Sequence, residues 1–189
     1  MMKKVLLLVA TVLFAASAFA QDISVGARVG SSFQAVGQYK YNGVNYVEAR
    51  FGTSVNNPAY VVGLGANDII DVVRESNHFM CDLTLLHNWH VFDMDWTPSL
   101  GEWFFDAGAG LNFGGIAGHA YVGVSGMARL GFAFLDWPIT LSVDWTPSFG
   151  PAVRYGKYTN EYGVDIKVRH TSFNTLGLAT LGITCTYNF

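Results

Sequence analysis

Charged residues are scarce in this chain, and long apolar runs are missing from nearly all of it. Charged side chains make up 13% of the residues and hydrophobic ones 51%, whereas an average soluble domain has about 25% charged residues. Beyond residue 21, no apolar run approaches the roughly 20 residues that a membrane-spanning helix needs. A helical membrane protein is therefore excluded. Apolar residues spread over alternating positions are typical of a barrel that faces lipid.

The first twenty residues form a leader and not part of the fold. Lys3 and Lys4 precede an apolar stretch over 5–14, and Ala18-Phe19-Ala20 is an A-x-A cleavage site. The sequence thus predicts a signal peptide at 1–20, export through the Sec pathway, and a mature domain at 21–189. The residue after the site is Gln21 and not cysteine, which argues against a lipid-anchored N-terminus.

Basic residues and cysteines are also few. Without Lys3 and Lys4, nine basic residues face 14 acidic ones, a formal net charge of −5, and no basic stripe suggests a nucleic-acid partner. Cys81 and Cys185 could pair in an oxidising compartment. Because both fall on outward positions of strands that are not neighbours, we predict two buried free thiols. The histidines show no metal-ligand spacing, and no glycine-rich phosphate loop occurs, so no cofactor is expected.

The last eleven residues show the strongest pattern in the chain. Apolar residues occupy every second position, with small or polar residues between them: Ala179, Leu181, Ile183, Cys185, Tyr187 and Phe189. A period of two over this length predicts a β-strand with one apolar and one polar face. The ending Tyr187–Phe189 resembles the terminal strand that the assembly machinery of bacterial outer-membrane barrels reads.

Similar alternation predicts eight strands in all. The fold class is therefore all-β, a transmembrane antiparallel up-and-down β-barrel. Asn42-Gly43 predicts a hairpin with a loop of residues 41–43. Residues 55–77 are expected to form a long external loop, because a strand near 59–66 would make nine where an even number is required. The polar stretch 150–174 is expected to form a second long external loop. The predicted strands cover 23–30, 33–41, 47–51, 78–91, 103–113, 122–134, 139–145 and 179–189.

Large aromatic residues gather at the end of the predicted barrel that carries the short turns. Indole rings favour the boundary between membrane and water, because one edge is apolar and the other donates a hydrogen bond. We therefore expect a periplasmic aromatic belt of Trp89, Trp96, Trp103, Trp137 and Phe189.

Charged residues fall on the inward positions of the predicted strands in equal numbers of each sign. A four-residue turn at 135–138 sets Arg129 opposite Asp144, where an ion pair is expected. An eight-stranded barrel is just wide enough for side chains to fill, so we favour a closed, charge-paired interior over the alternative of a narrow channel. The expected network contains Arg28, Lys40, Glu48, Arg50, Asp82, Asp106, Arg129 and Asp144.

One stretch offers a candidate for catalysis. His170-Thr171-Ser172-Phe173-Asn174 faintly resembles the His-x-Ser-Asn stretch of outer-membrane lipid A deacylases, in which a histidine activates a serine. Residues two apart on a strand share a face, and Glu161 or Asp165 could orient His170. The asparagine is displaced by one place, and a polar loop stem is the simpler interpretation. The sequence therefore favours a protein that is not an enzyme, with a lipid A hydrolase as the alternative.

The whole mature chain resembles the small eight-stranded outer-membrane proteins of the OmpX and OmpA-barrel type. The resemblance rests on Trp103-Phe104-Phe105-Asp106-Ala107-Gly108, on the stretch from Gly126 to Pro147 that contains Leu-Ser-x-Asp-Trp-x-Pro, and on the terminal Tyr187-x-Phe189. It implies an outer-membrane location among phospholipid and lipopolysaccharide, and delivery by the barrel-assembly machinery. A structural or surface-interaction role through the external loops, with an unknown extracellular ligand, would follow.

Overall fold

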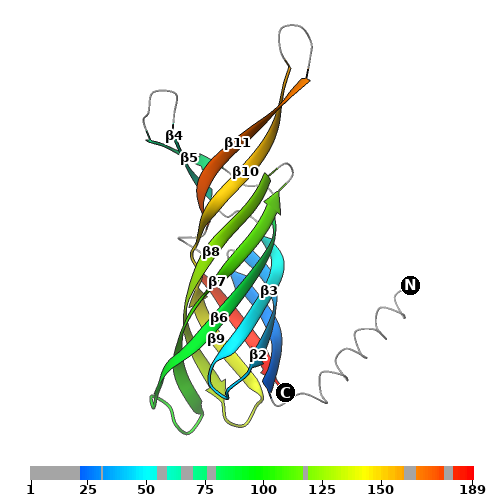
Figure 1. Cartoon of the computed structure of the whole chain (residues 1–189). Helices are drawn as coiled ribbons and strands as arrows, with labels where there is room; N and C mark the ends of the chain where they lie inside the picture. Colours follow the sequence, from blue (N-terminus) through cyan, green and yellow to red (C-terminus); the bar gives the residue numbers. More distant parts are fainter. Residues whose placement is uncertain are drawn as a thin grey trace, which may run out of the picture.

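The computed structural model describes residues 22–30, 32–54, 59–64, 70–75, 80–116, 119–159, 165–176 and 181–189. No described helix is long and apolar enough to cross a membrane. The predicted leader lies outside the described residues. Within them, twelve strands form one antiparallel sheet (Figure 1). They are β1 (Ile23–Gly30), β2 (Ser32–Lys40), β3 (Tyr46–Ser54), β4 (Ala59–Leu64), β5 (Ile70–Glu75), β6 (Met80–Met94), β7 (Gly101–Ile116), β8 (His119–Phe134), β9 (Ile139–Trp145), β10 (Ser148–Thr159), β11 (Asp165–Leu176) and β12 (Leu181–Asn188).

Eight of the described strands close into a barrel. The ring runs β1, β2, β3, β6, β7, β8, β9 and β12, with β12 hydrogen-bonded to β1 and the β8–β9 pairing closing the circle. The prediction of an eight-stranded up-and-down barrel is therefore confirmed. The turns at 41–45, 95–100 and 135–138 lie at one end of the barrel, called the turn end below; β10 and β11 rise beyond the far end (Figure 1).

The barrel has a polar inside and an apolar outside. Among the described residues, five hydrophobic side chains are buried against 19 polar or charged ones, which inverts the usual arrangement of a globular core. Alternation along each strand produces this inversion, because successive side chains point to opposite faces. In β12, for example, Ile183 is 61% exposed and its neighbour Thr184 is 1% exposed.

The two segments predicted to be external loops contain strands, which corrects that prediction. Within 55–77, β4 and β5 form a hairpin; within 150–174, β10 pairs with β11, and β11 pairs with β4. This extended sheet lies outside the closed ring, so the even strand count of the barrel still holds. The alternation rule failed here because it detects strands with one apolar face. β10 begins with an apolar alternation of Phe149, Pro151, Val153 and Tyr155. Charged and polar residues on both faces of the rest of β10 and β11 hid this pattern, although both strands contain Val, Ile, Thr and Tyr, which favour strands.

A proline marks the point where the barrel and the extended sheet separate. β8 pairs with β9 up to Ala128 opposite Trp145, and then with β10 from Ser125 opposite Ser148, without a change of register. Between them, Pro147 cannot donate a backbone hydrogen bond, although its carbonyl accepts one from the Gly126 amide at 2.9 Å. On the other side, β9 pairs with β12 and β10 pairs with β11.

The turn of the β2–β3 hairpin is longer than predicted. It covers residues 41–45, because Lys40 pairs with Tyr46, and not 41–43. Gly43 has a φ of 79°, and the Asn42 side chain accepts hydrogen bonds from the backbone amides of Val44 at 3.3 Å and Asn45 at 2.7 Å. Because the difference is two residues, the inward and outward faces of β3 stayed as predicted.

Both cysteines are free, as predicted, but neither is buried. Cys81 and Cys185 are exposed on the outer face of β6 and β12, which are not neighbours in the sheet. Outward positions of an eight-stranded barrel have no second protein layer above them, so the thiols face whatever surrounds the barrel.

Candidate functional site in the barrel interior

The interior is organised by a register row that crosses five strands. His90, Asp106, Arg129, Asp144 and Gly182 lie opposite one another in turn, on β6, β7, β8, β9 and β12. The predicted register of Arg129 opposite Asp144 is confirmed. Basic and acidic side chains alternate along this row, which ends at a glycine. Opposite charges therefore lie next to each other inside the barrel.

Two carboxylates and three guanidiniums form the central ion cluster, which we define as Arg28, Glu48, Arg50, Arg129 and Asp144. Each of the five is 2% exposed or less. Arg129 holds Glu48 in a bidentate pair, with Nη1–Oε2 at 2.8 Å and Nη2–Oε1 at 3.0 Å. The Nε of Arg50 also donates to Glu48. Buried charges are tolerated only when they are paired in this way.

Asp144 is the second anchor of the cluster. Its Oδ1 lies 2.8 Å from Arg28 Nε and 3.1 Å from Arg50 Nη1, and Thr184 donates to its Oδ2 at 2.7 Å. Arg129 is 3.9 Å from Asp144. The expected ion pair between these two residues is therefore a long contact, and the main partner of Arg129 is Glu48. Facing positions on neighbouring strands do not decide the partner, because a long arginine side chain can cross the lumen.

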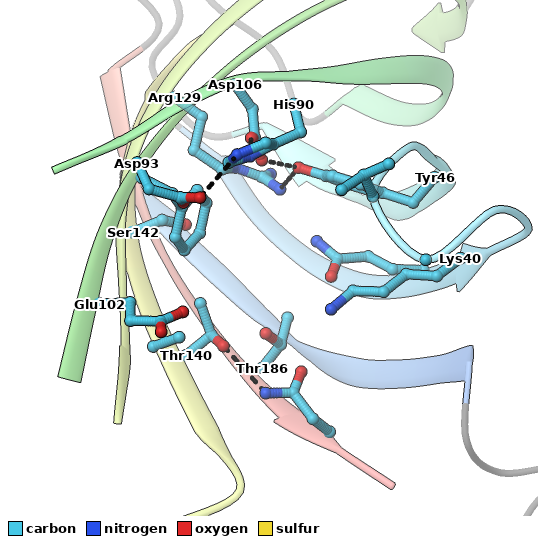
Figure 2. A pocket seen from close by; sticks show the side chains of 16 residues that line it. Lys40, Tyr46, His90, Asp93, Glu102, Asp106, Arg129, Thr140, Ser142 and Thr186 are labelled. Atoms are coloured by element: carbon cyan, nitrogen blue, oxygen red, sulfur yellow. Dashed lines mark hydrogen bonds and ion pairs between the residues drawn. The ribbon is translucent and has the colours of Figure 1, made fainter. Parts of the chain in front are cut away.

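A hydrogen-bonded chain connects the cluster with the turn end. Arg129 donates to the Tyr46 hydroxyl at 2.8 Å, which donates to Asp106 at 2.7 Å. His90 Nδ1 lies 3.1 Å from Asp106, and His90 Nε2 lies 3.2 Å from Asp93. Figure 2 shows this chain beside a cavity of about 250 Å³ at the turn end of the lumen. We call the cavity the vestibule.

The remaining predicted lumen charges lie at the edges of the cluster. Asp82 is buried and accepts a hydrogen bond of 2.5 Å from Gln34. Lys40 is only partly buried; it lines the vestibule and makes no ion pair with any residue that the structure describes. Seven of the eight predicted charges are thus buried in the interior, and Lys40 stands at its mouth.

The network also contains residues that the prediction did not name, among them Tyr46, His90, Thr146 and Thr184. Tyr46 lies two residues before Glu48 and points inward like it, but it was missed because the predicted strand began after it. His90 lies two residues after Asn88 and likewise points inward. Thr146 was missed because it lies past the end of the predicted strand; it accepts from Arg50 at 2.9 Å and donates to Asp144 at 3.1 Å.

Aromatic side chains do gather near the turn end. Trp96, Trp103, Phe132, Phe134 and Trp137 form a continuous series of ring contacts across β7, β8 and the adjoining turns, with centroids 4.8–6.1 Å apart. Trp89 contacts His87 on the outer face of β6, and Phe189 contacts Tyr187. The predicted belt residues therefore lie in three groups on the barrel.

The candidate catalytic pair lies on β11 in the extended sheet. In the β10–β11 register, His170 is opposite Arg154 and Ser172 is opposite Ala152; their side chains lie outside what the structure describes. Among the described residues, no three His, Cys, Asp or Glu side chains converge as metal ligands would. No protein-family model and no curated protein matches this chain.

Proposed function

We propose that the chain is an integral barrel of the bacterial outer membrane, with a closed interior and a binding surface that projects outside. The observation that supports this proposal most strongly is that apolar side chains face outward and polar side chains face inward. Phe51, Val124 and Ile183 are each at least 60% exposed on the outer face, while the ion cluster fills the inside. An apolar surface that surrounds the whole barrel exceeds what a soluble monomer presents to water. A hydrocarbon environment accommodates this surface, because the closed ring of strands leaves no unpaired strand edge.

The aromatic groups set the orientation in this proposal. The ring series around Trp103 lies at the turn end, which fits an interfacial belt, and short turns are typical of the periplasmic side. The extended sheet then projects from the cell. Tyr187 and Phe189 serve as the assembly signal, and the outer wall contacts phospholipid and lipopolysaccharide.

The extended sheet is the part best suited to bind a partner. β10, β11, β4 and β5 continue the barrel wall, and among the described strands β5 lies at the edge of the sheet with β4 as its one neighbour. An edge strand presents unpaired backbone N–H and C=O groups. An extended peptide can add to such an edge as a further strand. A surface-exposed peptide segment of another protein is thus the class of extracellular ligand that fits.

Epitope insertion tests the location and the orientation together. One tag is inserted between β4 and β5, and another in the turn at 135–138. Antibody should label intact cells carrying the first tag, but label the second only after the outer membrane is permeabilised. The opposite pattern would reverse the orientation, and recovery of the protein from the soluble fraction would contradict membrane residence.

A lipid A hydrolase is the second candidate, favoured by the placement of His170 and Ser172 two residues apart on β11. Lipid A from cells that produce the protein, its Ser172→Ala variant or neither would be compared by mass spectrometry. Spectra that differ only for the unaltered protein would support hydrolysis. Identical spectra would leave the binding role as the proposal.

A further inference from the structure

A groove of about 680 Å³ crosses the outer wall of the barrel over five strands. Its first register row is formed by Val25, Gly37, Ala49, Leu85 and Leu111, which lie opposite one another on β1, β2, β3, β6 and β7. Gly37 and Ala49 make its floor because they have the smallest side chains of the row. A Cβ atom built on Gly37 would meet nothing within 4 Å.

Aromatic side chains stand on both sides of this floor. Phe51 follows Ala49 by two residues on β3 and is 62% exposed, and Tyr39 follows Gly37 by two residues on β2 and is 49% exposed. Residues two apart on a strand share a face, so both rings project from the same outer wall as the floor. Tyr39 lines the groove, and Phe51 lies on the opposite side of the floor, just beyond the lining residues.

The groove ends at a polar group in an otherwise apolar wall. In its second row, His87 lies opposite Val47 and Ala109. The Tyr41 hydroxyl lies 2.6 Å from His87 Nε2, and the His87 ring packs on Trp89 with centroids 4.7 Å apart. When His87 Nε2 donates its proton to Tyr41, the proton of the Tyr41 hydroxyl is left to donate to another acceptor.

We propose that this groove binds one glycerophospholipid, with an acyl chain on the floor of Gly37 and Ala49 and the phosphate near Tyr41. This proposal rests on the membrane location proposed above. The Tyr41 hydroxyl lies 2.6 Å from His87, and the row of His87 is two residues, about 7 Å along the strands, from the row of Gly37. One leaflet of hydrocarbon is about 15 Å thick, so the phosphate contact and the acyl floor fall within one leaflet. The groove volume lies in the range of about 300–1,000 Å³ typical of small-molecule sites.

A second copy of the chain fits this surface less well. A two-fold dimer brings the same patch of both copies together and requires that patch to be self-complementary. Two concave faces would leave an empty space between them. A flexible acyl chain fills a concave apolar surface without such complementarity.

Native mass spectrometry of the refolded barrel tests the proposal, with palmitoyl-oleoyl-phosphatidylglycerol as the probe. The unaltered protein should retain one lipid. Gly37→Leu and Ala49→Leu fill the groove and should lower retention about ten-fold or more, since lost burial of two methylene groups has an effect of this size. Ala27→Leu adds the same side chain to the outer wall beyond the groove lining, and should retain lipid like the unaltered protein.

Tyr41→Phe separates the phosphate contact from the acyl contact. We expect it to lower retention of phosphatidylglycerol severalfold and to leave retention of a diacylglycerol with the same chains unchanged. Equal retention of both lipids by Tyr41→Phe and the unaltered protein would overturn the assignment of the phosphate to Tyr41.

The remaining outcomes overturn the groove site. Equal retention by all groove and control variants would mean general lipid contact only. A lipid-free dimer that Gly37→Leu dissociates would assign this face to self-association. Failure of the folded barrel to insert into vesicles would overturn the membrane location as well, whereas insertion without lipid retention would overturn the groove alone.

Discussion

Arg129 is the residue on which the interior depends most. It pairs with Glu48 through two nitrogens and also donates to Tyr46. Its removal leaves Glu48, which is 2% exposed, with Arg50 and Gln38 as partners. Loss of one partner from a buried ion pair typically costs about 3–5 kcal/mol, because the remaining charge stays desolvated.

We therefore expect Arg129→Ala to lower the free energy of unfolding by about 3–5 kcal/mol, measured by urea titration of the barrel in lipid vesicles. The double variant Glu48→Gln, Arg129→Gln should recover a large part of this loss, because it removes the stranded carboxylate. Lys40→Ala is the matched control: Lys40 makes no ion pair among the described residues and should shift stability by about 0.5 kcal/mol or less. If Arg129→Ala were as stable as Lys40→Ala, the cluster would not stabilise the barrel.

At the scale of the element, the β2–β3 hairpin depends on one backbone conformation. Gly43 has a φ of 79°, a region that β-branched residues avoid and asparagine tolerates. Gly43→Val should destabilise the barrel by about 1–2 kcal/mol and Gly43→Asn by clearly less, measured by the same titration. Equal losses for both variants would mean that side-chain size, and not the backbone, decides the effect.

The β10–β11 hairpin should be separable from the barrel. Among the described residues, β10 pairs with β8 up to Arg154 opposite His119, and its residues beyond this point pair with β11. Replacing residues 155–169 with Asn-Gly joins Arg154 to His170 by a two-residue turn. We expect the shortened protein to fold and to change the free energy of unfolding by about 1 kcal/mol or less.

A proline substitution in a strand of the barrel ring is the comparison for that experiment. Thr184 on β12 lies opposite Arg28 on one side and Ser142 on the other. Thr184→Pro removes a donor from a strand that is paired on both edges and should prevent folding. If the shortened hairpin variant also failed to fold, the extended sheet would be a support of the barrel and not an independent element.

Sequence alternation predicted the ring because each of its strands separates an apolar from a polar surface. Arg129 and Asp144 were placed opposite each other by counting back from a four-residue turn, and the structure agrees. The same rule missed β10 and β11, because the apolar alternation of β10 from Phe149 to Tyr155 is short and polar residues on both faces follow it. It also could not identify Glu48 as the partner of Arg129, because that pair crosses the lumen between strands far apart in sequence.

At the scale of the whole molecule, we expect the ion cluster to close the lumen between the vestibule and the far end. The five side chains come from β1, β3, β8 and β9 and meet with separations of hydrogen-bond length. Eight strands leave a lumen that side chains can fill completely. A bare ion passing this point would have to displace charges that already satisfy one another.

Single-channel recording in a planar bilayer tests this closure. The unaltered protein should show no discrete current steps. The double variant Arg129→Ala, Asp144→Ala removes one charge of each sign, so the net charge of the cluster stays at +1 while two of its five side chains are lost; it should admit small, brief, salt-dependent steps. Ile183→Ala alters only the outer face and should remain silent. Regular steps from the unaltered protein, changed in size by the double variant, would show instead that the charged interior is an ion pathway, and the narrow-channel alternative would replace the closed barrel.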